Sequence, residues 1–135
     1  MSTDRLRAVT VEEILSFHND VITLDVGMRG IRDRGALEAV AARPQGSFGG
    51  IEHFPTPFAK AAALIESIIQ RHPFVDGNKR TGIKVGIFLL FLAGYELTSS
   101  PQELTNVTLE VAEHRLDVDG LTQWLEQHAQ PRSEP

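Results

Sequence analysis

Cysteine is absent from this chain of 135 residues. The absence excludes disulfide bonds, thiolate metal sites and cysteine nucleophiles. Basic residues are also few, since 13 Lys and Arg stand against 18 Asp and Glu and give a formal net charge of -5. Binding nucleic acid by general electrostatic attraction needs a basic surface, so we expect no direct binding of nucleic acid. A local basic pocket is still compatible with this charge.

Long hydrophobic runs are absent as well. The longest, Val85–Ala93, is interrupted by Gly86 and has about half the length that a membrane-spanning helix needs. No apolar stretch follows the charged residues of the amino terminus, so we expect no secretory signal there. These features predict a cytoplasmic protein without a membrane span.

The hydrophobic content of 41% and the charged content of 23% are typical of a soluble globular protein. The length suits one domain, which we place at residues 1–129. The remaining segment, Gln130–Pro135, is biased toward proline and polar residues, and we expect it to be disordered.

Hydrophobic residues recur at helical spacing through most of the chain and predict an all-α fold of about six helices. Thr10–Glu13 has the form of a capping box, and Thr56-Pro57 and Ser100-Pro101 each join an N-cap residue to a proline. The expected helices are 11–19 or a little beyond, 34–42, 57–71, 78–94, one beginning at Ser100-Pro101, and one capped by Asp119 or a neighbour. The segment 78–94 is apolar nearly all round, which predicts that it is the central helix.

Three glycines and three β-prone residues lie between Pro44 and Pro55. They are Gly46, Gly49 and Gly50, with Phe48, Ile51 and Phe54. Such a mixture predicts a mobile loop or a small β-hairpin. We call residues 45–54 the flap.

The segment 72–81, His-Pro-Phe-Val-Asp-Gly-Asn-Lys-Arg-Thr, has the pattern of a loop that leads into the N-terminus of a helix. A helix N-terminus attracts phosphate through its unpaired N–H groups and its dipole, and glycine at position 77 lets a ligand approach the backbone. Lys79 and Arg80 in the first turn oppose the dipole unless an anion lies among them. The segment therefore predicts an anion site; the alternative is a solvated first turn.

Two further side chains of this segment suit the same chemistry. Asp76 offers a hard oxygen ligand for a Mg²⁺ ion held by one carboxylate and substrate phosphates. His72 is the one group in the segment suited to act as a general base near neutral pH. The structural alternatives are a turn or N-cap role for Asp76 and a capping or partly buried position for His72.

The pattern His72-x-Phe74-x-Asp76-Gly77-Asn78-Lys79-Arg80 resembles the signature of the Fic family, and specifically of its death-on-curing (Doc) branch. A chance match of these residues has a probability on the order of 10⁻⁹ per starting position. The resemblance extends to Gly35–Glu38, the flap and Phe88–Leu92, so it covers most of the chain. It implies a compact six-helix Fic fold with a short β-hairpin-like flap before the motif.

The resemblance also implies a role for each motif position. His72 corresponds to the general base, Asp76 to the Mg²⁺ ligand and Phe74 to a hydrophobic anchor of the loop. The positions that correspond to nucleotide and phosphate contacts are Gly77, Asn78, Lys79 and Arg80. The flap is similar to a segment that aligns a target peptide by main-chain pairing, and the matching residues are Ile51, Glu52, His53 and Phe54.

Two positions favour phosphate transfer over AMP transfer. Most Fic enzymes transfer AMP and have glycine at the position of Lys79 and a second arginine at the position of Ile83. In the Doc branch the lysine accompanies ATP bound the other way round, with its γ-phosphate toward the target hydroxyl. The resemblance therefore implies a protein kinase that uses ATP and Mg²⁺. The alternatives are AMP transfer at the same site and a binding module without catalysis.

Many Fic enzymes carry an inhibitory helix with the pattern Ser or Thr, three residues, Glu, then Gly or Asn. The nearest fits, Ser99 with Glu103 and Thr122 with Glu126, do not complete it. The resemblance thus implies a toxin whose inhibitor is a separate antitoxin, similar to the prevent-host-death proteins. It also implies a threonine of elongation factor Tu as the target, with arrest of translation as the outcome.

Overall fold

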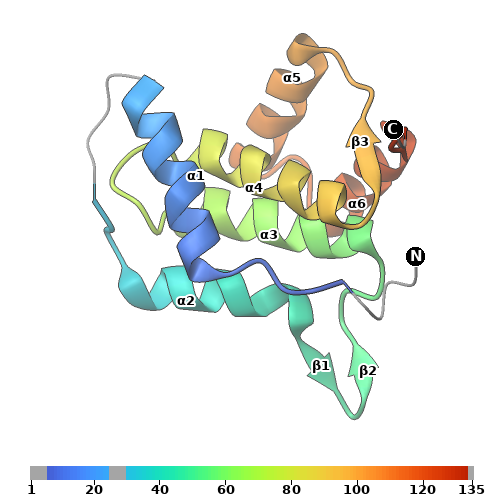
Figure 1. Cartoon of the computed structure of the whole chain (residues 1–135), viewed down its shortest axis with the longest axis horizontal. Helices are drawn as coiled ribbons and strands as arrows, with labels where there is room; N and C mark the ends of the chain where they lie inside the picture. Colours follow the sequence, from blue (N-terminus) through green and yellow to red (C-terminus); the bar gives the residue numbers. More distant parts are fainter. Residues whose placement is uncertain (1–5, 25–29, 134–135) are drawn as a thin grey trace.

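The computed structural model describes residues 6–24 and 30–133 (Figure 1). Over these residues the helices are α1 (Val11–Leu24), α2 (Arg34–Ala42), a 3₁₀ turn η2 (Arg43–Gln45), α3 (Pro57–Arg71), α4 (Asn78–Leu92), α5 (Pro101–Ala112) and α6 (Val118–Gln127). The strands β1 (Ser47–Phe48) and β2 (Ile51–Glu52) form one antiparallel pair, and β3 (Tyr95–Leu97) and β4 (Ala129–Pro131) form another. The predicted all-α fold with a short hairpin before the motif is confirmed. No helix in the described ranges is long and apolar enough to cross a membrane.

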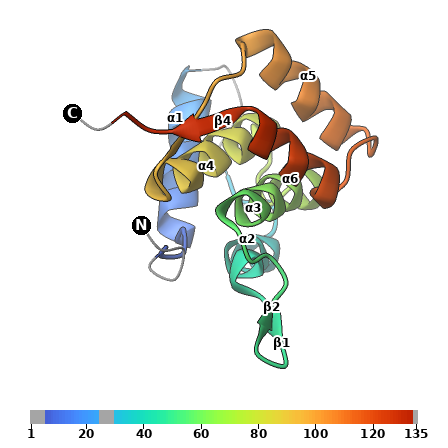
Figure 2. The same cartoon turned by 90° about the vertical axis from the view of Figure 1, so that its right-hand side faces the viewer.

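Helix α3 is the most enclosed helix of the described part of the chain. It contacts α2, α4, α5 and α6, and ten of its 15 residues are buried (Figures 1 and 2). In α4 only seven of 15 residues are buried, and Phe91 is 50% exposed. The expectation that segment 78–94 is the central helix is therefore wrong. The cause is that α4 turns its cations and one side of its apolar surface outward.

Glycines let α3 and α4 approach each other closely. A Cβ atom at Gly86 would lie 2.4 Å from the Ile65 side chain, and one at Gly82 would lie 3.3 Å from the Ile65 carbonyl oxygen. The two glycines are four residues apart and so share one face of α4. This packing sets the end of α3, where His72 lies, beside the start of α4.

The ends of several helices follow the expected capping signals. Thr56 accepts the Ala59 N–H at the start of α3, and Ser100 forms a complete capping box at the start of α5. Helix α6 is capped by Asp117 rather than Asp119, because the Asp117 carboxylate accepts the Gly120 N–H.

Helix α1 begins at the expected capping box and extends beyond residue 19. The box of Thr10 and Glu13 is present, and the Arg7 guanidinium hydrogen-bonds Glu13 and lowers the pKa of that carboxyl to about 2. The helix continues past Asn19 to Leu24, since Val21 and Ile22 extend its buried stripe.

The carboxyl-terminal segment is ordered where it was expected to be disordered. Gln130 and Pro131 belong to β4, which pairs with β3 in the register Tyr95↔Pro131 (Figure 2). The Arg132 N–H then donates to the Gly94 carbonyl at 2.8 Å, and the Arg132 guanidinium lies 3.9 Å from the centre of the Phe91 ring. The prediction for Gln130–Pro135 is thus wrong at its start, because main-chain pairing with β3 holds it; Glu134 and Pro135 lie outside the described residues.

Candidate functional site

His72 ends α3 in an unusual backbone conformation. Its φ and ψ are 50° and 60°, in the left-handed region, and its N–H donates to the Ile68 carbonyl. The following Pro73 disfavours the right-handed helical conformation at position 72, and the helix stops there as expected. The His72 side chain is exposed at the surface.

The start of α4 has the features of an anion site. Its N-cap is Gly77, with φ of 80°, and this residue has no side chain that could cap the helix end. A Cβ atom at position 77 would lie 3.2 Å from the side chains of Val21 and Ile22, so both the space and the backbone angle require glycine. The first N–H groups of a helix have no partner within the helix, and such an N-terminus is a common site for phosphate.

Asn78 closes the loop between the two helices. Its side-chain oxygen accepts the Phe74 N–H at 3.1 Å, and its amide nitrogen donates to the Phe74 carbonyl at 2.9 Å. The same nitrogen lies 3.4 Å from His72 Nδ1, which makes a long contact with the expected general base. The Asn78 side chain thus holds the loop between α3 and α4 through both main-chain groups of Phe74.

Phe74 has the buried position expected of a loop anchor. It is 1% exposed and lies parallel to the His18 ring, with ring centres 3.8 Å apart and planes 8° apart. His18 Nε2 also lies 2.8 Å from the main-chain oxygen of Asp76. No role was expected for His18 from the sequence. The signal that could have singled it out is its place on the buried stripe of α1, where a polar side chain needs a partner.

Arg32 is a second residue that contacts the motif loop and that was not identified from the sequence. Its Nε and Nη2 atoms donate to the carbonyl oxygens of His72 and Arg71, both at 2.6 Å. Its main-chain N–H donates to the Pro73 carbonyl at 2.8 Å. Positive groups stabilise the free carbonyls at a helix C-terminus. Arg32 therefore fixes the end of α3, and no local pattern in the sequence indicates this contact.

Lys79, Arg80 and Asp76 are exposed around the N-terminus of α4. Lys79 and Arg80 also line a groove of about 530 Å³ between α4 and α5. The other lining residues are Ile83, Lys84, Ile87, Pro101, Leu104, Thr105, Thr108 and Leu109, so the groove combines three cations with an apolar wall and no acidic residue. Such a surface suits an anionic ligand with an apolar part.

The donor set fits a Mg²⁺ ion only together with a phosphate ligand. The described residues hold no cluster of three or more His, Asp or Glu side chains that could bind a metal by themselves. Mg²⁺ is commonly held by one or two carboxylates, water and substrate phosphates. The exposed Asp76 carboxylate, next to the N-terminus of α4, fits that requirement.

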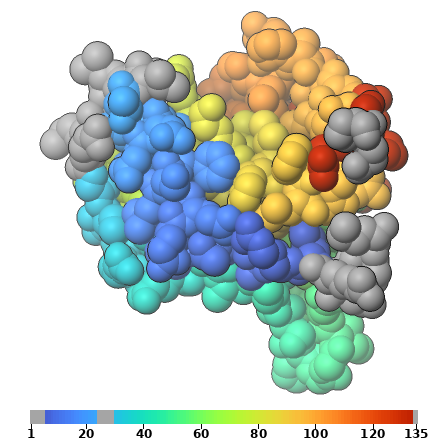
Figure 3. All heavy atoms as spheres, viewed as in Figure 1, coloured from blue at the N-terminus to red at the C-terminus, as the bar shows by residue number. Residues whose placement is uncertain are grey.

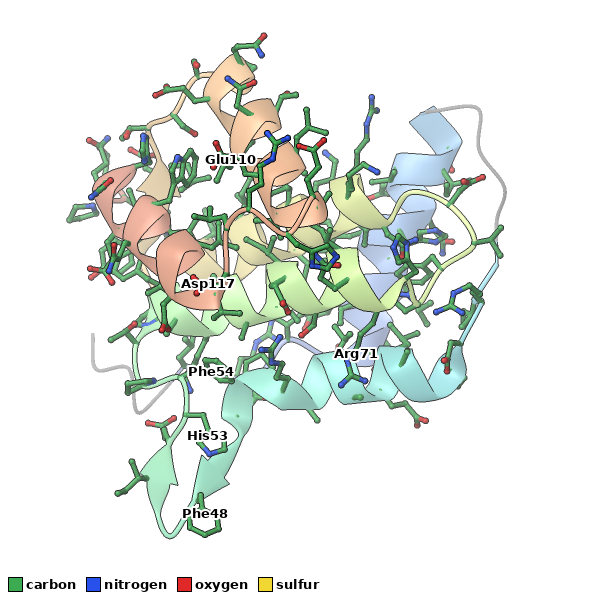
Figure 4. All side chains as sticks on the ribbon, turned by 180° about the vertical axis from the view of Figure 1, so that it is seen from behind. Phe48, His53, Phe54, Arg71, Glu110 and Asp117 are labelled. Carbon is green, nitrogen blue, oxygen red and sulfur yellow. The ribbon has the colours of Figure 1, made fainter. Side chains whose placement is uncertain are left out.

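The flap lies at the other end of α3 from His72. Phe48, His53 and Phe54 are at the hairpin end of the molecule in Figure 4, and Arg71 lies toward the far end of α3. The 15 residues of α3 span about 22 Å. The hairpin stands out from the body of the molecule (Figure 3), and Lys60 holds its base through Glu52 at 2.7 Å. The structure thus does not bring Ile51, Glu52, His53 and Phe54 to the motif loop.

Residues 8–90, which include the whole motif loop, match the sequence profile of the Fic/DOC family. A protein named Toxin Doc from Mycolicibacterium smegmatis is 36% identical over 96 residues, which cover 67% of this chain and 72% of that protein. A protein named Protein kinase doc from Escherichia phage P1 is 28% identical over 120 residues, which cover 89% of this chain and 94% of that protein.

Proposed function

Because this chain belongs to the Fic/DOC family, we propose that it is a Doc-like toxin that transfers the γ-phosphate of ATP to a serine or threonine hydroxyl of a host protein. The observation that carries the proposal is the N-terminus of α4, which has Gly77 at its N-cap and lies beside the exposed His72 at the end of α3. The name of the phage P1 relative, Protein kinase doc, supports phosphate as the transferred group.

In the proposed reaction His72 takes the proton of the target hydroxyl as its oxygen attacks the γ-phosphorus. A new O–P bond forms, the bond between the γ-phosphorus and the β–γ bridging oxygen breaks, and ADP leaves. The N–H groups around Gly77 and Asn78, with Lys79 and Arg80, bind the phosphates and offset their charge. Asp76 would hold Mg²⁺, which when bound neutralises phosphate charge. The groove between α4 and α5 would take the less polar part of the nucleotide.

Lys79 and Ile83 support phosphate transfer over the AMP transfer of most Fic enzymes. Both residues line the groove beside the N-terminus of α4, so they can influence which way a nucleotide lies. A lysine fills space that glycine leaves open, and isoleucine supplies no phosphate contact. AMP transfer at the same site is the second candidate, because the remaining motif residues suit either orientation.

The proposed target is elongation factor Tu, with translation arrest as the outcome in the cytoplasm. The proposed inhibitor is a separate antitoxin of the prevent-host-death type. The name of the M. smegmatis relative, Toxin Doc, supports the toxin part of this proposal. Alignment of the target by Ile51–Phe54 is also part of the proposal and requires the target to reach from the hairpin to His72.

Transfer from ATP labelled at the α- or the γ-phosphate distinguishes the candidates. We expect purified elongation factor Tu to gain label from γ-labelled ATP and none from α-labelled ATP. Label from the α-position alone would establish AMP transfer. Label from neither position, with both elongation factor Tu and whole-cell extract as targets, would contradict transferase activity and favour a binding module.

A Lys79→Gly variant tests the argument about nucleotide orientation. We expect at least a tenfold loss of label transfer from the γ-phosphate, with transfer from the α-phosphate appearing or unchanged. Lys84→Gly is the matched control, since Lys84 lines the same groove five residues further along α4. Unchanged γ-transfer in Lys79→Gly would show that Lys79 does not set the orientation.

A further inference from the structure

His18 is a buried, ionisable side chain that the proposed mechanism does not use. It lies on α1 with 2% of its surface exposed, one turn from the buried residues Ile14 and Ile22. An imidazole in an apolar core is costly unless its ring nitrogens find hydrogen-bond partners. The buried position of the His18 side chain therefore depends on the polar groups that its ring nitrogens contact, and not on apolar packing alone.

The His18 ring contacts the motif loop at two points. Nε2 lies 2.8 Å from the main-chain oxygen of Asp76, and a carbonyl oxygen can only accept, so Nε2 carries a proton and donates. The face of the same ring covers Phe74 at 3.8 Å between centres. A residue 58 positions earlier in the chain thus joins the anchor of the loop to the main chain beside the expected metal ligand.

The hydrogen bond acts on the peptide group that joins Asp76 to Gly77. A trans peptide is planar, and its C=O and N–H point in opposite directions. Because the Asp76 carbonyl points toward α1, the Gly77 N–H is directed away from α1. Gly77 has no Cβ to restrict its backbone and adopts φ of 80°, so this peptide group would otherwise turn with little resistance.

We propose that His18 is a positioning residue, whose Nε2–H fixes the peptide group between Asp76 and Gly77 and thereby sets the direction of the Asp76 carboxylate and the Gly77 N–H. The inference rests on the proposed function for the identity of the ligands, a Mg²⁺ ion and a phosphate. The hydrogen bond between His18 and the Asp76 carbonyl is independent of the identity of those ligands. Groups that orient a metal ligand typically change metal affinity or activity by ten- to a hundredfold when they are lost.

Two variants separate the hydrogen bond from the ring packing. His18→Phe keeps a flat ring against Phe74 and loses the donor, whereas His18→Gln keeps an N–H donor at a similar reach and loses the ring. We expect His18→Phe to raise the Mg²⁺ concentration for half-maximal transfer about tenfold, and His18→Gln to stay within threefold of the wild type. The reverse order, with His18→Gln the weaker variant, would overturn the proposal in favour of ring packing.

Nuclear magnetic resonance gives a readout that does not depend on activity. In the wild-type protein we expect His18 as the Nε2–H tautomer, with that proton protected from exchange with water. The Gly77 amide resonance should shift in His18→Phe and return in His18→Gln. A freely exchanging Nε2–H, or a Gly77 amide equally unaffected in both variants, would overturn the proposal.

The two hypotheses fail separately. If the wild-type protein transfers no phosphate, the proposed function fails while the resonance data still decide the role of His18. If the transfer occurs and the His18 variants behave alike, the positioning role fails and the proposed function stands. Should His18→Phe not fold, the wild-type tautomer and exchange measurement remains a complete test of the hydrogen bond.

Discussion

Replacing His72 by asparagine should reduce transfer of the γ-phosphate at least about a hundredfold, since a general base contributes about 10²- to 10⁴-fold to a rate. Asparagine is the sharper substitution than alanine because His72 has φ of 50°, and asparagine tolerates the left-handed region. The variant therefore keeps the end of α3 and removes only the proton acceptor. The initial rate of label transfer from γ-labelled ATP measures the effect.

The chain offers a matched control for this substitution. His114 follows α5 with φ of 61°, and it is exposed like His72. The variant His114→Asn should transfer phosphate within twofold of the wild-type rate. ATP affinity should change less than threefold in His72→Asn, because the expected phosphate contacts belong to the start of α4. A His72→Asn variant that keeps more than a tenth of the wild-type rate would exclude His72 as the general base.

Helix boundaries followed from residues that lie next to one another in the chain. The ranges 34–42 and 57–71 were predicted correctly because a cap or a proline stands at or beside the residues it controls, as Thr56 and Pro57 do. The carboxyl-terminal strand was missed for the opposite reason. Its pairing partner, Tyr95–Leu97, is more than 30 residues away, and nothing in Gln130 or Pro131 specifies that partner.

In the motif loop too, local features were predicted from the sequence and long-range contacts were not. Its sequence indicated His72, Asp76 and a helix N-terminus, since those residues are contiguous and chemically distinctive. Asn78 and Phe74 hold the loop from within the motif, whereas two further contacts come from elsewhere: His18 from α1 and Arg32 from the segment before α2. Neither belongs to a local pattern, because a hydrogen bond to a main-chain carbonyl can be made by many side chains from any direction. The sequence thus indicated the chemistry of the loop and its anchor Phe74, and it left out the contacts of His18 and Arg32.

Replacing Phe74 by alanine should destabilise the protein by about 3–5 kcal/mol, the usual range when a fully buried phenylalanine is truncated. Phe74 is 1% exposed and loses its contact with His18 in this variant. Its two hydrogen bonds to Asn78 use main-chain atoms, so the substitution leaves their donors and acceptors in place and tests the ring alone. Urea unfolding followed by circular dichroism gives the change in free energy.

Phe48→Ala is the matched control, because Phe48 is 81% exposed at the hairpin and should change the free energy of unfolding by less than about 0.5 kcal/mol. A loss below 1 kcal/mol in Phe74→Ala would contradict an anchoring role.

Phe74→Leu tests whether the ring contact itself affects the site. Leucine preserves much of the apolar contact, and similar-sized hydrophobic substitutions cost under about 1.5 kcal/mol. It cannot stack on His18, but it leaves the His18 hydrogen bond to the Asp76 carbonyl in place, so we expect its Mg²⁺ requirement for transfer to stay within threefold of the wild type, as in His18→Gln. A larger rise would show that the ring contact, and not the hydrogen bond alone, positions the loop.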